Sequence, residues 1–160
     1  MSKPVIVIRK LEDSPEWLDR RLVAAYLKTV YRVIFSPGGK GESMAADVHP
    51  GRPHSPRFGR WLEERNCGTC SIVTASNPAS VRLSGEENAR SNKKLASDLR
   101  KASRLLLPAT NLDPDDRWPP EESFFACGIS AGDAVQLGRK YGQNAIICWE
   151  KGGIPELWWL

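Results

Sequence analysis

The feature of the sequence that most constrains its fold is the alternation of strand-like and helix-like segments after Cys67. Two segments open with the same capping pattern, a serine followed three residues later by an acidic residue: Ser84 with Glu87, and Ser130 with Asp133. The segments around them are short, apolar and rich in β-branched or aromatic residues, as buried strands are. From Thr69 onward the chain therefore predicts strand, helix, strand, strand, helix, strand, and then one further strand.

The limits of these elements follow from turn residues and caps. We expect helices at 84–102 and 130–141, and strands at 69–75, 105–107, 123–129, 145–150 and 156–160. Pro108 is expected to end its strand and to open a polar loop that runs to Glu121. The order of elements matches the ferredoxin-like, or split βαβ, arrangement. The predicted fold class is α+β, a β-α-β-β-α-β core with an N-terminal helix/strand extension and an extra C-terminal strand.

The N-terminal part is less regular. Ser14-Pro15 and the apolar residues that follow at helical spacing predict a helix over 15–28, and the β-branched and aromatic run at 29–35 predicts a strand. Residues 36–57 are rich in Gly, Pro, Ser and His, which predicts a long loop, either a mobile insertion or a binding loop that orders on a partner. A short helix at 58–65 follows.

Composition limits the class of protein. With 160 residues, of which 41% are hydrophobic and 26% charged, we expect a single globular domain over 1–160. No apolar run approaches the ~20 residues of a membrane span, and the first residues lack the pattern of a secretion signal. We therefore expect a cytoplasmic protein that makes no membrane contact.

The cysteine and histidine residues predict neither a metal site nor a cofactor. Cys67 and Cys70 have the spacing of a redox motif, but they precede a strand, whereas an activated thiolate usually stands at a helix N-terminus. His49 and His54 lie in a proline-rich segment without further ligands at metal spacing. We expect all four cysteines, Cys67, Cys70, Cys127 and Cys148, to be reduced thiols in or near the core.

Polar residues gather around the helix at 84–102. Asn88 and Asn92 fall on the same helical stripe as the apolar residues that face the core. A buried amide requires hydrogen-bond partners, and the preceding loop is the nearest supply. One interpretation is that the asparagines tie this loop to the helix while Glu87 caps it. The other is a polar pocket at the helix N-terminus, where an anionic ligand would bind.

Further polar residues stand at the beginnings of two strands, and the predicted topology brings these strand ends to the loop at Asn77. The predicted ligand-binding set is Asn77, Ser80, Glu87, Asn88, Asn92, Ser123, Gln143 and Asn144. Glu87 and Glu122 are the candidates for a catalytic acid or base. No residue set presents a nucleophile with an oriented base, so whether the protein is an enzyme stays open at this point.

Several of these residues resemble a known family. The series comprises Thr74-Ala75-Ser76-Asn77-Pro78, Leu83-Ser84 with Glu87-Asn88 and Asn92, Trp118-Pro119 with Glu122-Ser123, and Gly142-Gln143-Asn144-Ala145. In combination it is similar to the bacterial domain family of unknown function DUF3293. The resemblance covers most of the chain from Tyr31 onward, and residues 36–57 are the least similar part. It implies a cytosolic protein of bacterial or phage origin and brings no established activity or cofactor.

A basic helix surface is the second functional signal. The net charge is +4 and the pI is near 9.0, and five cations lie opposite the apolar stripe of the helix at 84–102: Arg90, Lys93, Lys94, Arg100 and Lys101. They form either a solvated face or a contact for an acidic protein or a nucleic acid. The sequence favours an accessory protein that engages such a macromolecule. The alternative is a small enzyme or anionic-ligand-binding domain that uses the Glu/Asn/Gln pocket.

Overall fold

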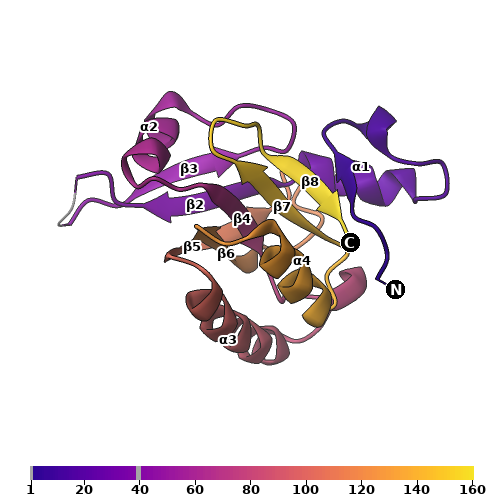
Figure 1. The fold of residues 1–160 in the computed structure, drawn as a ribbon. Coiled ribbons are helices and arrows are strands. Elements are labelled where there is room, and N and C mark those ends of the chain that lie inside the picture. Colours follow the sequence, from indigo (N-terminus) through magenta and orange to yellow (C-terminus); the bar gives the residue numbers. More distant parts are fainter. Residues whose placement is uncertain (1, 39–40) are drawn as a thin grey trace.

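The computed structural model describes residues 2–38 and 41–160. Within these residues the strands form one antiparallel sheet in the order β1-β8-β7-β4-β6-β5-β2-β3, which curls into a half-barrel (Figure 1). The strands are β1 Ile6–Ile8, β2 Val30–Phe35, β3 Met44–Val48, β4 Thr69–Val73, β5 Leu105–Leu112, β6 Glu121–Cys127, β7 Ala145–Glu150 and β8 Glu156–Trp159. The helices are α1 Arg20–Lys28, α2 Pro56–Glu64, α3 Gly85–Ala102 and α4 Ala131–Lys140, with short 3₁₀ turns at Leu11–Asp13 and Pro78–Ser80.

The predicted ferredoxin-like fold is wrong. The elements after Thr69 follow one another in the expected order, but they do not form a separate four-stranded sheet. On one side β2 pairs with β5 and β3 pairs with β2, and on the other side β8 and β1 continue the sheet beyond β7. The N-terminal segments that were expected to be an extension therefore supply strands at both ends of one curled sheet.

One strand, β3, was missed, and another, β5, was predicted too short, for a related reason. Residues 36–57 contain β3, which pairs with β2 in the register Phe35↔Met44, so the long-loop prediction is wrong there; residues 39 and 40 of that segment lie outside the described residues. Pro108 does not end β5, which continues to Leu112. The pairing between β2 and β5 stops at Ala109, so the missing N–H of Pro108 removes no hydrogen bond to β2. Both strands are stabilised by a partner that is distant in sequence.

The helices begin close to where their caps predict. The Ser84 hydroxyl accepts the Glu87 N–H at 3.1 Å and the Glu87 carboxylate accepts the Ser84 N–H at 3.0 Å, which completes the predicted capping box of α3. At α1, however, the capping residue is Asp19 rather than Ser14, so that helix starts at Arg20. Ser14 and Pro15 instead belong to the turns that precede the helix.

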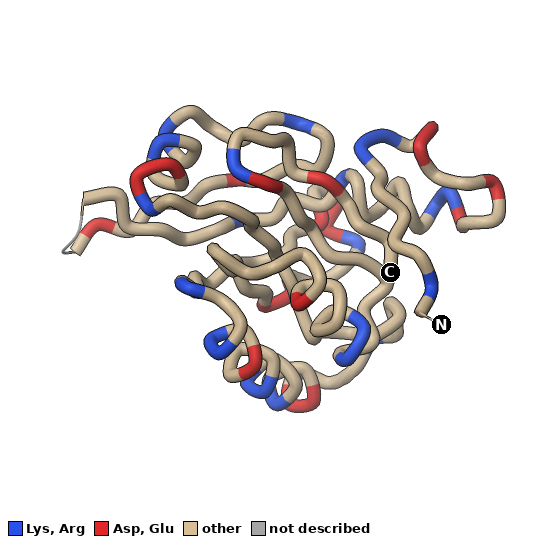
Figure 2. The backbone as a smooth tube through the Cα atoms, in the orientation of Figure 1, with Lys and Arg blue, Asp and Glu red and all other residues tan. Residues whose placement is uncertain are grey.

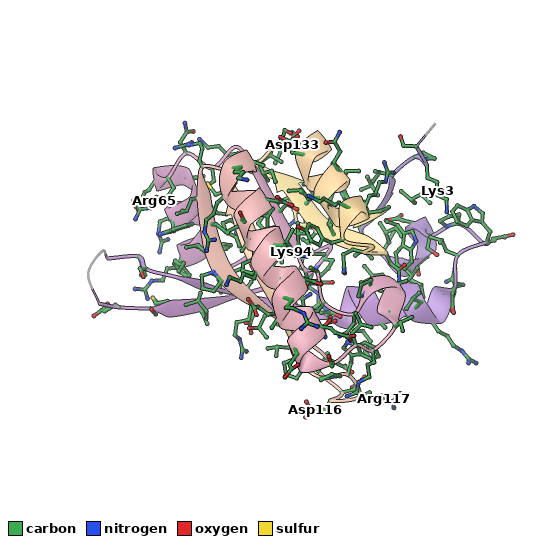
Figure 3. The ribbon with its side chains drawn as sticks, turned by 90° about the horizontal axis from the view of Figure 1, so that it is seen from below. Lys3, Arg65, Lys94, Asp116, Arg117 and Asp133 are labelled. Carbon is green, nitrogen blue, oxygen red and sulfur yellow. A yellow bond between two sulfur atoms is a disulfide. The ribbon has the colours of Figure 1, made fainter. Side chains whose placement is uncertain are left out.

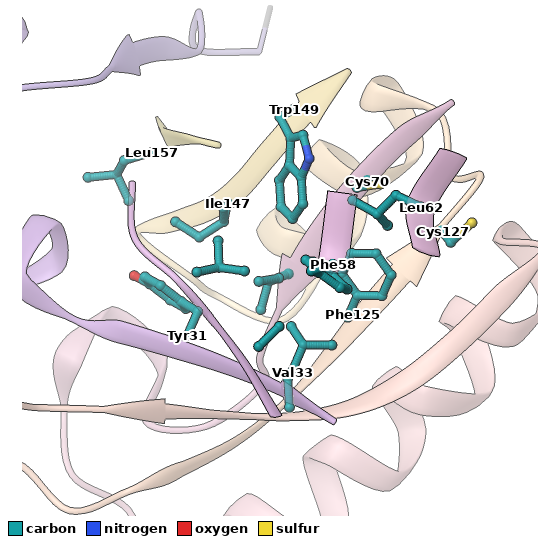
Figure 4. Close-up of a cluster of buried hydrophobic side chains, with 14 of the residues drawn as sticks. Tyr31, Val33, Phe58, Leu62, Cys70, Phe125, Cys127, Ile147, Trp149 and Leu157 are labelled. Carbon is teal, nitrogen blue, oxygen red and sulfur yellow. The ribbon is translucent and has the colours of Figure 1, made fainter. Parts of the chain in front are cut away.

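The two faces of the sheet carry separate apolar clusters. On one face α3 and α4 pack against β4, β6 and β7, with Leu95 and Leu99 fully buried (Figure 1). On the other face Phe58 of α2 packs against Phe125, with ring centroids 5.6 Å apart, and Phe125 against Trp149 at 5.9 Å (Figure 4). Because α2 packs beside the Phe35 end of β2, the opposite end of this face is left for α1.

The structure contains a disulfide between Cys67 and Cys127, so the expectation of reduced thiols is wrong for these two residues. Cys67 precedes β4 and Cys127 ends β6, and the antiparallel pairing of these strands brings their Cα atoms to 5.3 Å. Sequence spacing does not reveal such a long-range contact. Cys70 and Cys148 are free and buried, and burial raises the pKa of both thiols to about 12. Among the described residues, no helix combines the length and apolar composition that crossing a membrane requires.

Candidate functional site

A cavity of about 550 Å³ opens at the end of the sheet where β2 begins and β4 ends. Its floor includes Tyr31, Ile72 and Ile147, and α1 forms one wall. Polar lining residues come from the remaining sides: Thr74, Ser76, Asn77, Ser80, Asn111, Glu121 and Gln143. Volumes of 300–1,000 Å³ with mainly apolar walls and a few convergent polar groups are typical of small-molecule sites.

The antiparallel register explains why these polar side chains meet. Tyr31 of β2 lies directly opposite Asn111 of β5, and Asn111 lies directly opposite Glu121 of β6. Residues opposite each other across antiparallel strands point to the same face and are close neighbours. Three strands that are neighbours in the sheet, β2, β5 and β6, therefore contribute one row of polar side chains to the floor of the cavity.

Glu121 is the carboxyl group of this row. Its Oε2 accepts a hydrogen bond of 2.7 Å from the side-chain amide of Asn77. Burial raises the pKa of the Glu121 carboxyl, and the bonds from Asn77 and Trp118 oppose this shift only in part. A carboxyl group held in this way is a proton acceptor or a partner for a hydrogen-bond donor.

Asn111 stands beside Glu121 without a partner for its carbonyl oxygen. The Oδ1 atom is buried, and no described residue donates a hydrogen bond to it. Leaving a buried acceptor unpaired costs about 1–3 kcal/mol, so such groups are uncommon in folded proteins. The unpaired oxygen lies in a residue that lines the cavity.

A hydroxyl network forms the wall next to α1. The Tyr26 hydroxyl lies 3.0 Å from the Ser80 hydroxyl, and the Asn144 amide donates to Ser80 at 3.1 Å and to Tyr26 at 3.4 Å. Burial raises the pKa of the Tyr26 phenol, and burial does the same for Tyr31, which donates to the Tyr26 carbonyl at 3.4 Å. Both phenols are therefore neutral at ordinary pH.

The chain that bears Asn77 and Ser80 is conformationally strained. Asn77, Ala79 and Ser80 have φ values of 46°, 54° and 61°, a region that side-chain-bearing residues rarely adopt. Bonds from both ends hold the segment, since Asn77 N donates to Asn88 Oδ1 at 2.9 Å and Ala79 N donates to the Gly142 carbonyl at 2.9 Å. Strain of this kind costs about 1–3 kcal/mol per residue and is concentrated at ligand sites.

The loop between β5 and β6 forms the rim of the cavity. The Asp113 carboxylate accepts the backbone N–H groups of Asp115, Arg117 and Trp118 at 2.9–3.0 Å, which shapes the loop locally. An ion pair of 2.8 Å between Lys28 and Asp115 then joins the loop to α1. Asp116 and Arg117 lie at its outer tip (Figure 3).

The structure brings together only part of the predicted ligand-binding set. Asn77, Ser80 and Gln143 line the cavity. Asn88, Asn92 and Asn144 instead hold the segments behind it: Asn92, for example, accepts the Ala75 N–H at 2.8 Å and donates to Ser76 Oγ at 2.8 Å. Of the two interpretations of Asn88 and Asn92, loop anchoring is therefore the one that the structure supports.

The predicted catalytic candidates lie outside the cavity. Glu87 is exposed and caps α3, and Glu122 is exposed on the other face of β6, where only its backbone carbonyl takes part, accepting from Thr74 at 2.6 Å. Ser123 is fully buried, and no described residue bonds its hydroxyl. The cavity thus lies at the strand ends and not at the N-terminus of α3.

The lining residues that were missed include Tyr26, Tyr31, Asn111, Trp118 and Glu121. Asn111 was assigned to a loop because Pro108 was expected to end its strand. Glu121 was passed over because β6 begins two residues before the predicted start, so this residue was assigned to the preceding loop. Residues 121–127 do not alternate between polar and apolar residues, so the sequence carried no clear signal for Glu121.

The predicted partner-binding residues are all exposed on α3: Arg90, Lys93, Lys94, Arg100 and Lys101. Figure 2 shows basic segments along this helix with acidic ones between them, and Lys94 lies near its middle in Figure 3. The structure therefore leaves this face open to solvent. Within the described residues, no group of three or more His, Cys, Asp or Glu side chains is placed to hold a metal ion.

Comparison with known families gives one result. The model of a family described as "Protein of unknown function (DUF3293)" matches residues 73–146 and confirms the resemblance noted in the sequence. The matched segment contains Asn77, Asn111, Glu121 and Gln143, whereas α1 and β2 lie outside it. No curated protein and no solved structure shows a significant match to the chain.

Proposed function

We propose that this protein, which matches the DUF3293 family over residues 73–146, binds a small molecule in the cavity between α1 and the strand ends. The observation that carries the proposal is the pairing of Asn111 and Glu121 on the floor of a ligand-sized cavity. One presents a buried unpaired oxygen and the other a carboxyl with a raised pKa. Perturbed groups that converge in a cavity are a physical mark of a functional site.

Binding is favoured over covalent catalysis by the chemistry of the lining. Among the described residues that line the cavity there is no Cys and no His, and the serine hydroxyls there bond to amides or to a phenol. Activation of a serine nucleophile needs an oriented base. Glu121 accepts from Asn77 rather than from a serine, which suits recognition of a ligand.

A cavity-blocking substitution tests this function. Ala25 lies on the exposed surface of α1 and lines the cavity, so Ala25→Trp should obstruct it without repacking the core. The matched control is Ala89→Trp, at an exposed alanine of α3 that is absent from the lining. Amide chemical shifts would be followed by NMR during titration with benzamide as a neutral aromatic probe.

The expected result is a set of saturable shifts around Tyr31, Asn111 and Glu121 in the wild type and in the control. Ala25→Trp should abolish them. Shifts scattered over the surface, or equal shifts in both variants, would contradict a binding function for the cavity.

We propose, as a second function, that α3 contacts an acidic macromolecule. The supporting observation is the exposure of all five cations on one helix. The test is binding of labelled duplex DNA by the wild type and by a Lys93→Glu, Lys94→Glu variant, with Lys151→Glu as an exposed control outside α3. Steep loss of affinity with added salt in the wild type, and loss in the α3 variant alone, would support nucleic acid as that partner.

A further inference from the structure

We infer that the ligand of the cavity presents a protonated nitrogen group, such as an amidinium, whose N–H donors bind the side chains of Asn111 and Glu121. This inference rests on the proposed binding function and specifies the chemistry of its ligand. It follows from which hydrogen-bonding groups of the lining are already engaged and which are not.

Apart from the side-chain amide of Asn111, the donors around the floor are engaged with the protein itself. The Asn77 amide donates to Glu121, and the Gln143 amide donates to the carbonyls of Ser76 and Tyr141 at 3.1 and 3.3 Å. The Thr74 hydroxyl donates to the Glu122 carbonyl at 2.6 Å. A ligand that required donors from these residues would have to break existing bonds.

The Tyr26–Ser80 pair is the exception. The two hydroxyls share one hydrogen bond, and the Asn144 amide donates to both oxygens. One hydroxyl proton of the pair is therefore left for an acceptor. This donor stands on the wall beside α1.

Acceptors on the floor, in contrast, remain open. Asn111 Oδ1 accepts from no described residue, and the bonds from Asn77 and Trp118 occupy only part of the roughly four acceptor positions of the Glu121 carboxylate. Asn111 and Glu121 are direct cross-strand neighbours, at a spacing of about 5 Å between Cβ atoms. A planar group with N–H donors on two nitrogens matches two adjacent acceptors of this kind.

The other charged residues of the lining are at the rim, whereas the Glu121 carboxyl is at the floor. The rim carries Arg21, Lys28, Arg117, Asp113 and Asp115, and of its three cations, all exposed, Lys28 is paired with Asp115. Tyr26 and Tyr31 face the same space as neutral phenols. Exposed charges are screened by solvent, so an ionised Glu121 would contribute a negative potential at close range to a ligand on the floor.

The pKa of Glu121 supports the same conclusion. Burial raises it because the ionised form is poorly solvated within the lining. A cation bound next to the carboxylate would replace the lost solvation and would favour the ionised form. Binding of a cation should therefore weaken when Glu121 is protonated.

Three probes of one shape test the inference: benzamidine, benzamide and benzoate. Each has the same ring, but only the first is a cation with two donor nitrogens, and the last has no donor. In NMR titrations the wild type should bind benzamidine about tenfold more tightly than benzamide, and benzoate more weakly still. Glu121→Gln, which keeps an acceptor for Asn77, should reduce the preference for benzamidine to about twofold or less.

Glu122→Gln is the matched control, since it changes the neighbouring, exposed carboxylate of the same strand and should leave the preference intact. A second arm measures benzamidine affinity against pH. The affinity for benzamidine should fall on acidification in the wild type and in Glu122→Gln, but not in Glu121→Gln. The comparison of the wild type with Glu122→Gln tests the pH effect even if Glu121→Gln is less stable.

The outcomes separate the two proposals. If all three probes shift the cavity resonances with similar affinity, or if benzoate binds best, the cavity is a binding site but the inference of a cationic ligand is overturned. If no probe shifts those resonances, the proposed function falls together with the inference.

Discussion

The side-chain amide of Asn77 donates a hydrogen bond of 2.7 Å to the carboxyl of Glu121, and this bond joins the chain after β4 to the first residue of β6. Asn77 has a left-handed backbone, and its own Oδ1 accepts the Leu83 N–H and the Asn88 amide, each at 2.9 Å. One asparagine thus connects the strained segment, α3 and the half-buried carboxyl of Glu121. The position of Glu121 depends on this connection.

Glu121 should make the stability of the protein depend on pH. Its pKa in the folded state is raised above the ordinary value of 4.5, so folding favours the protonated form. That contribution is full below pH ~4.5 and is lost as pH rises through the folded-state pKa. Urea denaturation of Glu121→Gln across pH 4–8 should therefore show a stability difference from the wild type that shifts in favour of the variant as pH rises. Glu122→Gln, at an exposed position, should show no such trend.

Asn92 should be a structural residue whose loss destabilises the fold. Asn92→Ala removes the acceptor for the buried Ala75 N–H and the donor to Ser76 Oγ. Leaving such groups unpaired costs about 1–3 kcal/mol. The free energy of unfolding from urea titration measures this loss, and Ser97→Ala, at an exposed position of the same helix, should change it by less than about 0.5 kcal/mol.

Ala79 is a position where a substitution should increase the free energy of unfolding. Its φ is 54° and it is exposed, so glycine would relieve left-handed strain without removing a buried side chain. Ala79→Gly should stabilise the protein by up to about 1 kcal/mol. In the regular helix α3, Ala89→Gly should instead destabilise it by about 1 kcal/mol. A loss of stability in both variants would show that the segment is not strained.

The Cys67–Cys127 disulfide should contribute measurably to stability. It closes a loop with a sequence separation of 60 residues, and bridges of this kind typically contribute about 2–4 kcal/mol. Reduction, or the Cys67→Ala, Cys127→Ala double variant, should lower the free energy of unfolding by that amount. Thiol titration in denaturant should find two reactive cysteines, Cys70 and Cys148, before reduction and four after it. Four thiols without reduction would contradict the bridge.

Local signals in the sequence located most of the helices and strands. The Ser84–Glu87 capping box predicts the start of α3, and Ser130, whose hydroxyl accepts the Asp133 N–H at 3.0 Å, predicts that of α4. These contacts lie within one helical turn, where residue type and spacing are sufficient. The strands β3 and the second half of β5 were missed because their pairing with β2 is what makes them strands.

The polar loop at Asn77 was likewise visible in the sequence, together with Ser80 and Gln143 as members of a site. The Glu121 carboxyl was not, because β6 begins two residues before the predicted start and Glu121 was therefore assigned to the preceding loop. Its neighbour Glu122, whose side chain points to the opposite face, was chosen instead. The sequence by itself determined the helix caps, the order of the later elements and the polar loop, since these depend on neighbours along the chain. Only the tertiary structure decided the curled eight-stranded sheet, the disulfide and the row of Tyr31, Asn111 and Glu121, because each depends on strand register between distant segments.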